Sequence, residues 1–267
     1  MAILFIYIVA ASHNPDSVEC VVPYRIDEDL IFFGPCKKRL RKWLSHRYLN
    51  GVDDAIPDDD IFVVGVNGNN KQRIRKIVWA GRIARVMTFE AAYNNLNGPN
   101  FQEMRCHDFS PLHVKPLYDS AGEFLGYEHI SREHEREDNW VLDFTDRRSN
   151  TYVIRQGKQL LIKPDTGRCQ AFPRDCCFLC DNIFFAQGAG IPITDKILAV
   201  LTGVQPGKEI DPYAIFGYRA DGSIVGLTGK YLPISGESAE ELIGLIRDSK
   251  PVAQGTTKRQ LKPCNCR

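Results

Sequence analysis

The sequence predicts an α+β fold in which a small curved or barrel-like sheet is flanked by short helices. Strand-like apolar segments outnumber amphipathic helical ones, and the two kinds do not alternate as they would in repeated βαβ units. The composition is that of an ordinary globular protein, since 43% of the 267 residues are hydrophobic and 25% are charged. A sheet with a few helices packed on it is therefore the simplest way to bury the predicted core.

The first half of the chain is predicted to supply most of the strands. A helix should begin at Gly34-Pro35, because proline at the first helical position loses no hydrogen bond, and it should end near Gly51. Asn67-Gly68-Asn69-Asn70 predicts a hairpin turn. Strands are expected at about residues 3–10, 61–66 and 74–87, extended segments between 17 and 33, and a short helix at 89–96.

The second half is less regular. Residues 98–150 are predicted to be an irregular insertion in a single domain that spans 1–250. Ser238 and Glu241 form a capping box that predicts the start of a last amphipathic helix, and the polar residues 251–267 are expected to be a flexible tail. The other expected elements are a hairpin around Gly157, a strand and glycine-rich turn over 177–192, a helix with Thr194 as its cap, and a hairpin at Asp221-Gly222.

Charge and hydropathy exclude several classes of protein. The net charge is +1, so no overall basic field attracts nucleic acid, and such binding would depend on a local patch. The apolar start MAILFIYIVAA is about half the roughly 20 residues that a membrane-spanning helix needs, and it lacks the basic residues that open a signal peptide. Nine cysteines, an odd number, exclude a complete disulfide framework. We therefore expect a cytoplasmic protein with no membrane contact, whose cysteines are thiols or metal ligands.

The predicted helix at 35–49 carries an unusual concentration of positive charge. No acidic residue occurs between 33 and 51, but six basic ones do: Lys37, Lys38, Arg39, Arg41, Lys42 and Arg47. A helix N-terminus has partial positive charge, so cations in its first turn are favourable only if an anion lies beside them. That anion is either the protein's own Asp53–Asp60 loop or a phosphate group. A solvated amphipathic helix with no bound anion is the alternative.

A second basic stretch, residues 71–85, contains six Lys or Arg and no acid, so the two stretches could flank a nucleic-acid groove. Trp79 lies in this stretch and is either part of the core or the stacking wall of a base pocket, which Phe32 and Phe33 would join. Enzymes and readers that inspect a base outside the duplex stack it on such rings. Trp43 and Tyr48 are interpreted more simply as the buried face of the helix.

Other motifs are less specific. Cys177-x-x-Cys180 has zinc-site spacing, with Cys264-x-Cys266 as a second pair, but its apolar surroundings favour a buried strand. Cys106-His107 places a nucleophile beside a base, although neighbours in sequence need not converge in space. His13, Asp16 and Asp58–Asp60 offer metal ligands, but an acidic loop is more often solvated. The sequence has no P-loop, HExxH or GxSxG motif, and Gly188-x-Gly190 lacks the third glycine of a dinucleotide site.

Four segments in the same order resemble the nucleotide-modification-associated domain family. They are LIFFGPCKKRLRKWL, DDDIFVVGVNG, RKIVWAGRIARVMTFEAAYNN and LCDNIFFAQGAGIPI. The family is similar to PUA-like, ASCH and EVE modules, compact β-barrels that read modified bases or act in nucleotide modification, so the resemblance implies a PUA-like domain. The chain departs from the family pattern at Lys38, at Asp59-Asp60 and at Phe184-Phe185-Ala186.

The basic helix and the resemblance together predict a binding module for DNA or a nucleotide with a modified base, with no cofactor and no metal. Phosphate would lie at the helix N-terminus, and a base pocket would lie between the first polar turn and the aromatic residues. The predicted contacts are Ser12, His13, Asn14, Phe33, Cys36, Lys37, Arg39, Asn67, Arg73, Arg75 and Trp79. One alternative is an enzyme that acts on a nucleotide through His13 or Asp58–Asp60, with or without a metal. Another is a protein-interaction scaffold whose partner binds residues 123–148.

Overall fold

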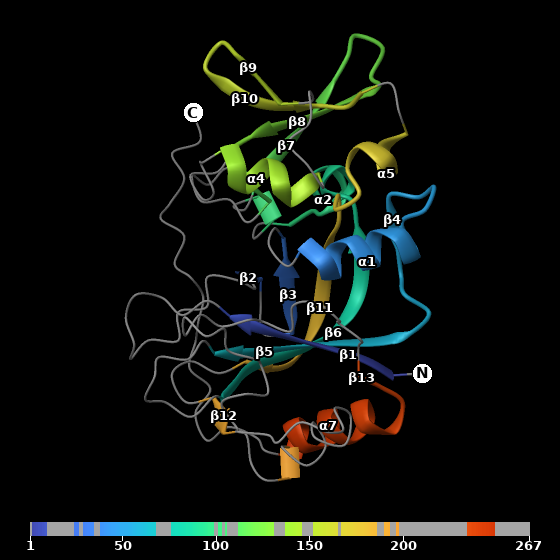
Figure 1. Ribbon diagram of the computed structural model, residues 1–267, viewed down its shortest axis with the longest axis vertical. Coiled ribbons are helices and arrows are strands. Elements are labelled where there is room, and N and C mark those ends of the chain that lie inside the picture. The colour runs from blue at the N-terminus through green and yellow to red at the C-terminus, as the bar shows by residue number, and fades with distance from the viewer. Residues whose placement is uncertain are drawn as a thin grey trace, which may run out of the picture. The chain divides into compact units, whose positions relative to one another are not determined.

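Strands and helices are mixed along the chain in a computed structural model, which confirms the α+β class (Figure 1). The structure describes residues 2–9, 24–26, 29–34, 38–67, 76–98, 101–102, 105, 112–130, 137–145, 152–164, 167–185, 190–192, 196–197 and 234–248. The chain forms two compact units. Unit 1 comprises Met1–Ile31, Asp58–Ile83 and Cys180–Arg259, and unit 2 comprises Phe32–Pro57, Ala84–Leu179 and Gln260–Arg267. The chain passes between the units within three strands, at residues 31–32, 83–84 and 179–180.

Unit 1 is built on a sheet with a parallel pair at its centre. Strand β1 (Ala2–Val9) runs parallel to β5 (Asp60–Asn67), which pairs antiparallel with β6 (Lys76–Met87). The strand order is β13-β1-β5-β6-β11-β3-β2, and β12 also pairs with β6. The remaining bounds are β2 (Tyr24–Arg25), β3 (Leu30–Phe33), β11 (Cys177–Phe185), β12 (Ile191–Pro192) and β13 (Ile234–Ser235). The predicted strands at 3–10, 61–66 and 74–87 are confirmed as β1, β5 and β6.

Helix α7 (Glu237–Asp248) covers this sheet with its apolar side. Ala239, Leu242, Ile243 and Ile246 are buried in one hydrophobic cluster with side chains of β1, β5 and β6. Their spacing of three and four residues places them on one face of the helix, as the sequence pattern predicts. The helix begins at Glu237, so Ser238 lies in its first turn and the prediction that Ser238 is the cap is wrong.

Unit 2 contains a four-stranded antiparallel sheet in the order β7-β8-β10-β9, with short helices beside it (Figure 1). The strands are β7 (Val114–Tyr118), β8 (Phe124–His129), β9 (Tyr152–Arg155) and β10 (Lys158–Ile162). The helices are α1 (Lys38–Tyr48), α2 (Phe89–Asn95), α4 (Glu137–Phe144) and α5 (Arg168–Ala171), and the short strand β4 (Asp54–Ala55) pairs with the end of β6. The region 98–150, predicted to be an insertion, therefore supplies β7, β8 and α4.

The predicted hairpin at Gly157 is confirmed as the turn between β9 and β10. Gln156 and Gly157 both have positive φ, of 52° and 76°. Positive φ at both central residues is the geometry of a type I′ turn, which matches the twist of the flanking strands. Glycine supplies this conformation without steric cost at the second position.

Aromatic rings form the core of unit 2. The centroid of Tyr127 lies 5.0 Å from that of Phe144 and 5.8 Å from that of Phe172, and Phe89 lies 5.1 Å from Phe144. The four residues come from β8, α2, the end of α4 and the residue after α5, and all are fully buried. Tilted ring pairs at these distances add stability beyond the burial of area. This core therefore ties the helices to the sheet.

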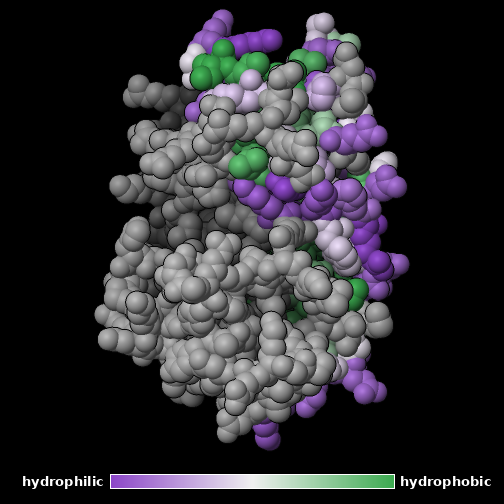
Figure 2. Space-filling view, in the orientation of Figure 1, coloured by the Kyte–Doolittle hydropathy of each residue, from purple (hydrophilic) through white to green (hydrophobic). Residues whose placement is uncertain are grey.

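Neither sheet closes into a barrel in the described part of the chain, so the barrel-like form of the prediction is wrong there and both sheets are open. No described helix is long and apolar enough to cross a membrane. Hydrophilic residues cover much of the described surface on the face that Figure 2 shows, with small hydrophobic patches among them. Ile56 and Ile154 are the most exposed large hydrophobic side chains described.

Candidate functional site

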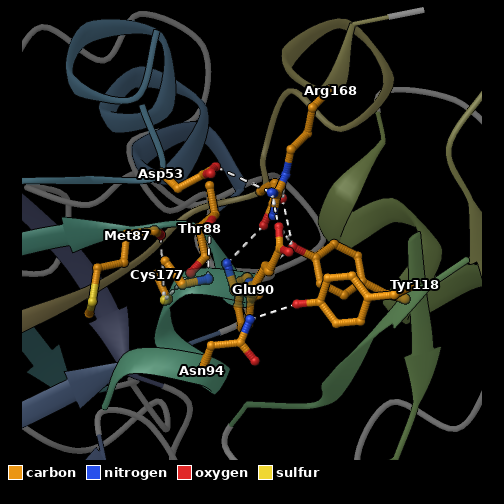
Figure 3. A network of polar contacts seen from close by, with 12 residues as sticks. Asp53, Met87, Thr88, Glu90, Asn94, Tyr118, Arg168 and Cys177 are labelled. Carbon is orange, nitrogen blue, oxygen red and sulfur yellow. Dashed lines mark hydrogen bonds and ion pairs between the residues drawn. The ribbon is translucent and has the colours of Figure 1, made fainter. Parts of the chain in front are cut away.

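Arg168 lies at the centre of a polar network within unit 2 (Figure 3). It is the first residue of α5, and the residue at the N-cap is Gly167, which has no side chain to cap the helix. Its Nε donates to Asp175 Oδ2 at 2.8 Å, and its Nη2 donates to the Tyr127 hydroxyl at 2.6 Å. Its Nη1 donates to Glu90 Oε2 and, at 3.2 Å, to Asp53 Oδ1. One guanidinium thus meets three carboxylates from three different segments.

An aromatic ring supports the same guanidinium from its face. Arg168 Cζ lies 4.1 Å from the ring centroid of Phe124 and 5.9 Å from that of Tyr127. A planar guanidinium stacks well on such rings while its edge stays free for hydrogen bonds. Burial opposes the charge of Arg168, but Asp175 and the other acids around it raise its pKa above the ordinary value. Arg168 is therefore a fixed cation in the folded protein.

Asp175 joins the network to the backbone of α2. Its side chain is only 3% exposed, and its Oδ1 accepts the amide N–H of Phe89 at 3.0 Å. Its Oδ2 accepts both from Arg168 and from the Tyr127 hydroxyl, the latter at 2.7 Å. A buried carboxylate with three donors is well satisfied, since bonds to an ionised acceptor are about twice as strong as neutral ones.

Tyr127 is held in its neutral form. Its hydroxyl donates to Asp175 and accepts from Arg168 and, at 3.2 Å, from the amide of Glu90. Burial and then the neighbouring charge of Asp175 raise the pKa of Tyr127 well above its ordinary value. The hydroxyl therefore keeps its proton at neutral pH and acts as a fixed donor to Asp175.

A second tyrosine lies beside the network. The side-chain amide of Asn94 donates to the Tyr118 hydroxyl at 2.6 Å, as drawn in Figure 3. Burial raises the pKa of Tyr118, and a hydrogen bond with Glu90 adds to this effect. Glu90 and Asn94 lie four residues apart on α2, so one face of this helix presents both side chains.

A pocket of about 230 Å³ opens beside Arg168. It is lined by the last turn of α1, the loop that follows it, the residue before α2, and the segment from α5 onward. The lining residues are Ser45, Leu49, Gly51, Val52, Asp53, Thr88, Arg168, Phe172 and Asp175. The amide of Thr88 donates to the Asp53 carbonyl at 2.8 Å, which fixes the loop although the Asp53 side chain is 59% exposed.

The charge around this pocket is negative on balance. Two carboxylates, Asp53 and Asp175, line it with one guanidinium, and Glu90 contacts that guanidinium from behind. The last turn of α1 also lines the pocket, and a helix C-terminus carries partial negative charge. Arg47 in that turn is exposed and lies over the ring of Trp43. The pocket therefore suits a ligand that presents N–H donors better than one that presents a phosphate.

Two of the eleven predicted contacts have described side chains. Phe33 and Trp79 are described, and both are fully buried, Phe33 stacked on Phe178 at 4.6 Å in unit 2 and Trp79 in unit 1. Such burial is what the core interpretation of Trp79 requires, and neither ring lines the pocket at Arg168. Seven predicted contacts lie outside the described residues: Ser12, His13, Asn14, Cys36, Lys37, Arg73 and Arg75. Arg39 and Asn67 lie in α1 and β5, but their side chains are not described.

The acidic loop, predicted as one possible occupant of the basic helix N-terminus, supplies partners to other arginines. Asp53 contacts Arg168, and Asp54 forms a two-pronged ion pair with Arg85, with a 2.8 Å bond to Arg85 Nε. In unit 1, Arg82 lies 2.7 Å from Asp181 and 3.7 Å from Asp60. Hydrogen bonds with these acids raise the pKa values of Arg82 and Arg85. Two cations of the 71–85 stretch are therefore neutralised within the protein.

The described acid that contacts the first turn of α1 lies on α4 and not in the 53–60 loop. Lys38 Nζ lies 3.8 Å from a carboxylate oxygen of Asp143, which is buried on α4. Arg41, one turn later, is itself fully buried. The predicted phosphate position would also involve Lys37 and Arg39, whose side chains are not described, so it stays a prediction.

The cysteines of the predicted zinc motif are buried thiols. Cys176, Cys177 and Cys180 are free, and burial raises the pKa of each. Cys177 Sγ lies 3.5 Å from the Met87 carbonyl, as expected for a thiol packed against a strand. Among the described residues no group of three or more His, Cys, Asp or Glu side chains could hold a metal. Cys264 and Cys266 are not described, so a site that they would complete is untested.

Sequence reasoning missed the residues that make the network. Arg168 begins a short helix, and its partners lie 7, 41, 78 and 115 residues away. No spacing rule connects such positions. The surplus of Asp in the 53–60 loop was a usable signal, because clustered carboxylates near a core require cations from elsewhere in the chain.

Comparisons of the chain with protein-family models, with curated proteins and with solved structures find no match. The function must therefore be argued from the network and the pocket themselves.

Proposed function

We propose that this protein is a binding module whose pocket at Arg168 accepts the edge of a nucleobase, including a modified one. The observation that carries the proposal is the lining of the pocket, where carboxylates and a guanidinium stand beside apolar side chains. Carboxylates accept hydrogen bonds from the amino groups of bases, and arginine donates to their ring nitrogens and carbonyl oxygens. Val52, which is 51% exposed, adds apolar surface that a flat ring can contact.

The size of the pocket agrees with a ligand of this class. At roughly 30 Å³ per water molecule in the liquid, the pocket holds about eight waters, which is enough room for one base. Sites for drug-sized ligands measure about 300–1,000 Å³, so a whole dinucleotide would not be enclosed here. A single base with its sugar in solvent fits these limits.

Asp53 is the residue best placed to contact a ligand. Asp175 already accepts three hydrogen bonds, whereas Asp53 is more than half exposed and makes one 3.2 Å contact with Arg168. A ligand N–H can therefore bind Asp53 without breaking the buried part of the network. Its backbone bond to Thr88 keeps the carboxylate at the pocket edge during this exchange.

The family resemblance supports the same ligand class. One of the resembling segments, RKIVWAGRIARVMTFEAAYNN, reaches the pocket through Thr88, and another, LIFFGPCKKRLRKWL, ends at Leu44, the residue before Ser45 in the pocket lining. A phosphate of a longer ligand would lie at the N-terminus of α1, with Lys37 and Arg39 beside it. At 1.5 Å per residue, Lys38 is about 10 Å along the helix from Ser45, so the phosphate position and the pocket are separate contacts.

Two buried groups close to the pocket are not suited to proton transfer at neutral pH. Tyr127 and Cys177 have raised pKa values because they are buried, so neither ionises near neutral pH. A general base or nucleophile needs a pKa close to the working pH. These two side chains are therefore suited to structure, not to proton transfer.

The proposal is tested by titrating the full chain with nucleosides, modified nucleosides and their monophosphates in a calorimeter, at low and high salt. We expect at least one nucleoside to bind as tightly as its monophosphate, with an affinity that salt does not change, because an uncharged ligand releases no counterions. Asp53→Asn should weaken this binding by about 5- to 100-fold, the range of one good base contact. Asp54→Asn is the matched control and should leave the affinity unchanged, since Asp54 pairs with Arg85 outside the pocket.

Two results would contradict the proposal. One is that no nucleoside binds at millimolar concentration. The other is that Asp53→Asn and Asp54→Asn have the same effect on affinity, which would place the binding surface elsewhere.

A further inference from the structure

A buried arginine donates hydrogen bonds to the backbone on both sides of Asp175. Arg41 lies on α1 and is fully buried. Its Nε donates to the Cys176 carbonyl at 2.6 Å, and its Nη2 donates to the Arg174 carbonyl at 2.6 Å. These carbonyls belong to the residues immediately before and after Asp175. The planar fork of a guanidinium fixes the two acceptors relative to each other, so it restrains the segment that carries the Asp175 side chain.

The same segment is held from a second direction. Arg174 donates from its Nη1 to the carbonyls of Leu142 and Thr145, at 2.7 and 2.6 Å, at the C-terminal end of α4. The amide of Asp175 also donates to the Phe172 carbonyl at 2.9 Å. The backbone around Asp175 is therefore hydrogen-bonded to the end of α4 through Arg174 and to α1 through Arg41.

Burying the charge of Arg41 costs more free energy than an apolar side chain at the same position would. Its Cζ lies 5.0 Å from the ring centroid of Phe89 and 5.6 Å from that of Phe144, a site where an apolar side chain would pack well. Within the described residues it makes no ion pair, and its Nη1 has no hydrogen-bond partner. A buried charge without a counterion lowers stability, and replacing such groups by apolar ones is often neutral or stabilising. A role in placing Asp175 explains why the guanidinium is there.

We infer that Arg41 is a positioning residue for the pocket: it sets the 174–176 backbone so that Asp175 meets Arg168, Tyr127 and the amide of Phe89. This inference rests on the proposed function for its consequence in binding, because the pocket is what Asp175 and Arg168 line. It connects the basic helix α1 to the pocket by hydrogen bonds that can each be removed.

The test reads the position of Asp175 directly, without a ligand. The amide of Phe89 donates to Asp175 Oδ1, so its proton and nitrogen shifts report whether that carboxylate is in place. Protein labelled with ¹⁵N-phenylalanine gives one peak per phenylalanine, and Phe89→Leu identifies the peak of interest. Asp175→Asn then defines the shift that results when the carboxylate is lost.

Arg41→Met keeps an unbranched side chain that follows the path of the arginine stem, and it removes both hydrogen bonds. We expect it to move the Phe89 peak toward its position in Asp175→Asn, and to weaken nucleoside binding by about tenfold, which corresponds to about 1.4 kcal/mol. Arg47→Met is the matched control on the same helix: Arg47 is exposed, and the Phe89 peak should not move. Arg41→Lys should give an intermediate peak position, because one ammonium cannot reach both carbonyls with the same geometry.

The inference is overturned if folded Arg41→Met leaves the Phe89 peak at its wild-type position. It is also overturned if neither Arg41→Met nor Arg41→Lys folds, because a general structural role is then sufficient. The proposed function fails in a different way, by the absence of nucleoside binding to the wild-type chain, and the Phe89 peak remains readable in that case.

Discussion

Replacing Asp175 by asparagine tests whether the Arg168 network stabilises unit 2. The substitution keeps the shape of the side chain but removes its charge and turns one acceptor oxygen into a donor. If the new amide group faces Phe89, it opposes the N–H of that residue. If it faces the other way, it opposes Arg168 Nε, which now donates to Asp175 at 2.8 Å. At least one of the three hydrogen bonds is lost in either orientation.

The expected cost follows from burial. Breaking a buried ion pair by removing one partner costs about 3–5 kcal/mol, and Asp175 is 3% exposed with Arg168 17% exposed. Arg168 keeps its contacts with Glu90 and Asp53, so the cation is not left alone. We therefore expect the lower end, about 3 kcal/mol. A domain stability of about 5–15 kcal/mol would leave the variant folded but measurably weaker.

Urea unfolding at pH 7, followed by far-UV circular dichroism and by tryptophan fluorescence, measures this cost. Asp54→Asn is the control in the same unit, because its ion pair with Arg85 is partly exposed and is expected to contribute about 1 kcal/mol or less. Equal losses of stability in the two variants would refute the view that Asp175 is the buried centre of the network.

Two further predictions concern Tyr127 and two glycines of the same sheet, Gly126 within β8 and Gly157 in the turn between β9 and β10. Tyr127 has a folded-state pKa above the ordinary value of 10, so its contribution to stability is complete below pH 10 and is lost as pH rises from there. Wild type should therefore lose about 1.4 kcal/mol more per pH unit than Tyr127→Phe above pH 10, as measured by urea unfolding from pH 8 to 11. Gly126 has φ of 145°, and an added Cβ would lie 2.0 Å from the Leu161 carbonyl oxygen. Gly126→Ala should therefore cost more than about 4 kcal/mol, whereas Gly157→Ala, with φ of 76° and open space, should cost about 1–2 kcal/mol; similar melting temperatures for the two would contradict this.

The parts of the fold that the sequence predicts are those governed by short-range patterns. β5 is a run of apolar residues after an acidic loop, and the turn at Gly157 carries the residue type that positive φ demands. Helix α2 is predicted from the segment FEAAYNNL, which Gly98-Pro99 ends, and the structure adds Thr88 as its N-cap. Each signal lies within about a dozen residues, so no knowledge of the tertiary structure is needed.

The open form of the sheets and the site could not be predicted in this way. Whether a sheet closes depends on the pairing of its edge strands, and β13 pairs with β1 across more than two hundred residues of chain. The pocket likewise depends on Asp53 and Arg168 meeting over 115 residues. Buried polar contacts of this range depend on the assembled core, and a sequence pattern shows only that unpaired carboxylates need partners somewhere.

The basic helix shows why a count of cations is a poor guide to where an anion binds. Of its six basic residues, Lys38 contacts a buried aspartate, Arg41 is enclosed and bound to carbonyls, and Arg47 lies on an aromatic ring. Charge that has been used inside the protein cannot also attract a phosphate, because each engaged group would have to give up its partner first. The pocket at the other end of α1, where carboxylates outnumber cations, is likewise unfavourable for a phosphate. Under the proposed function, a base is therefore expected to be recognised through its N–H donors, and a phosphate contact would have to come from Lys37 or Arg39, whose side chains lie outside the described part of the structure.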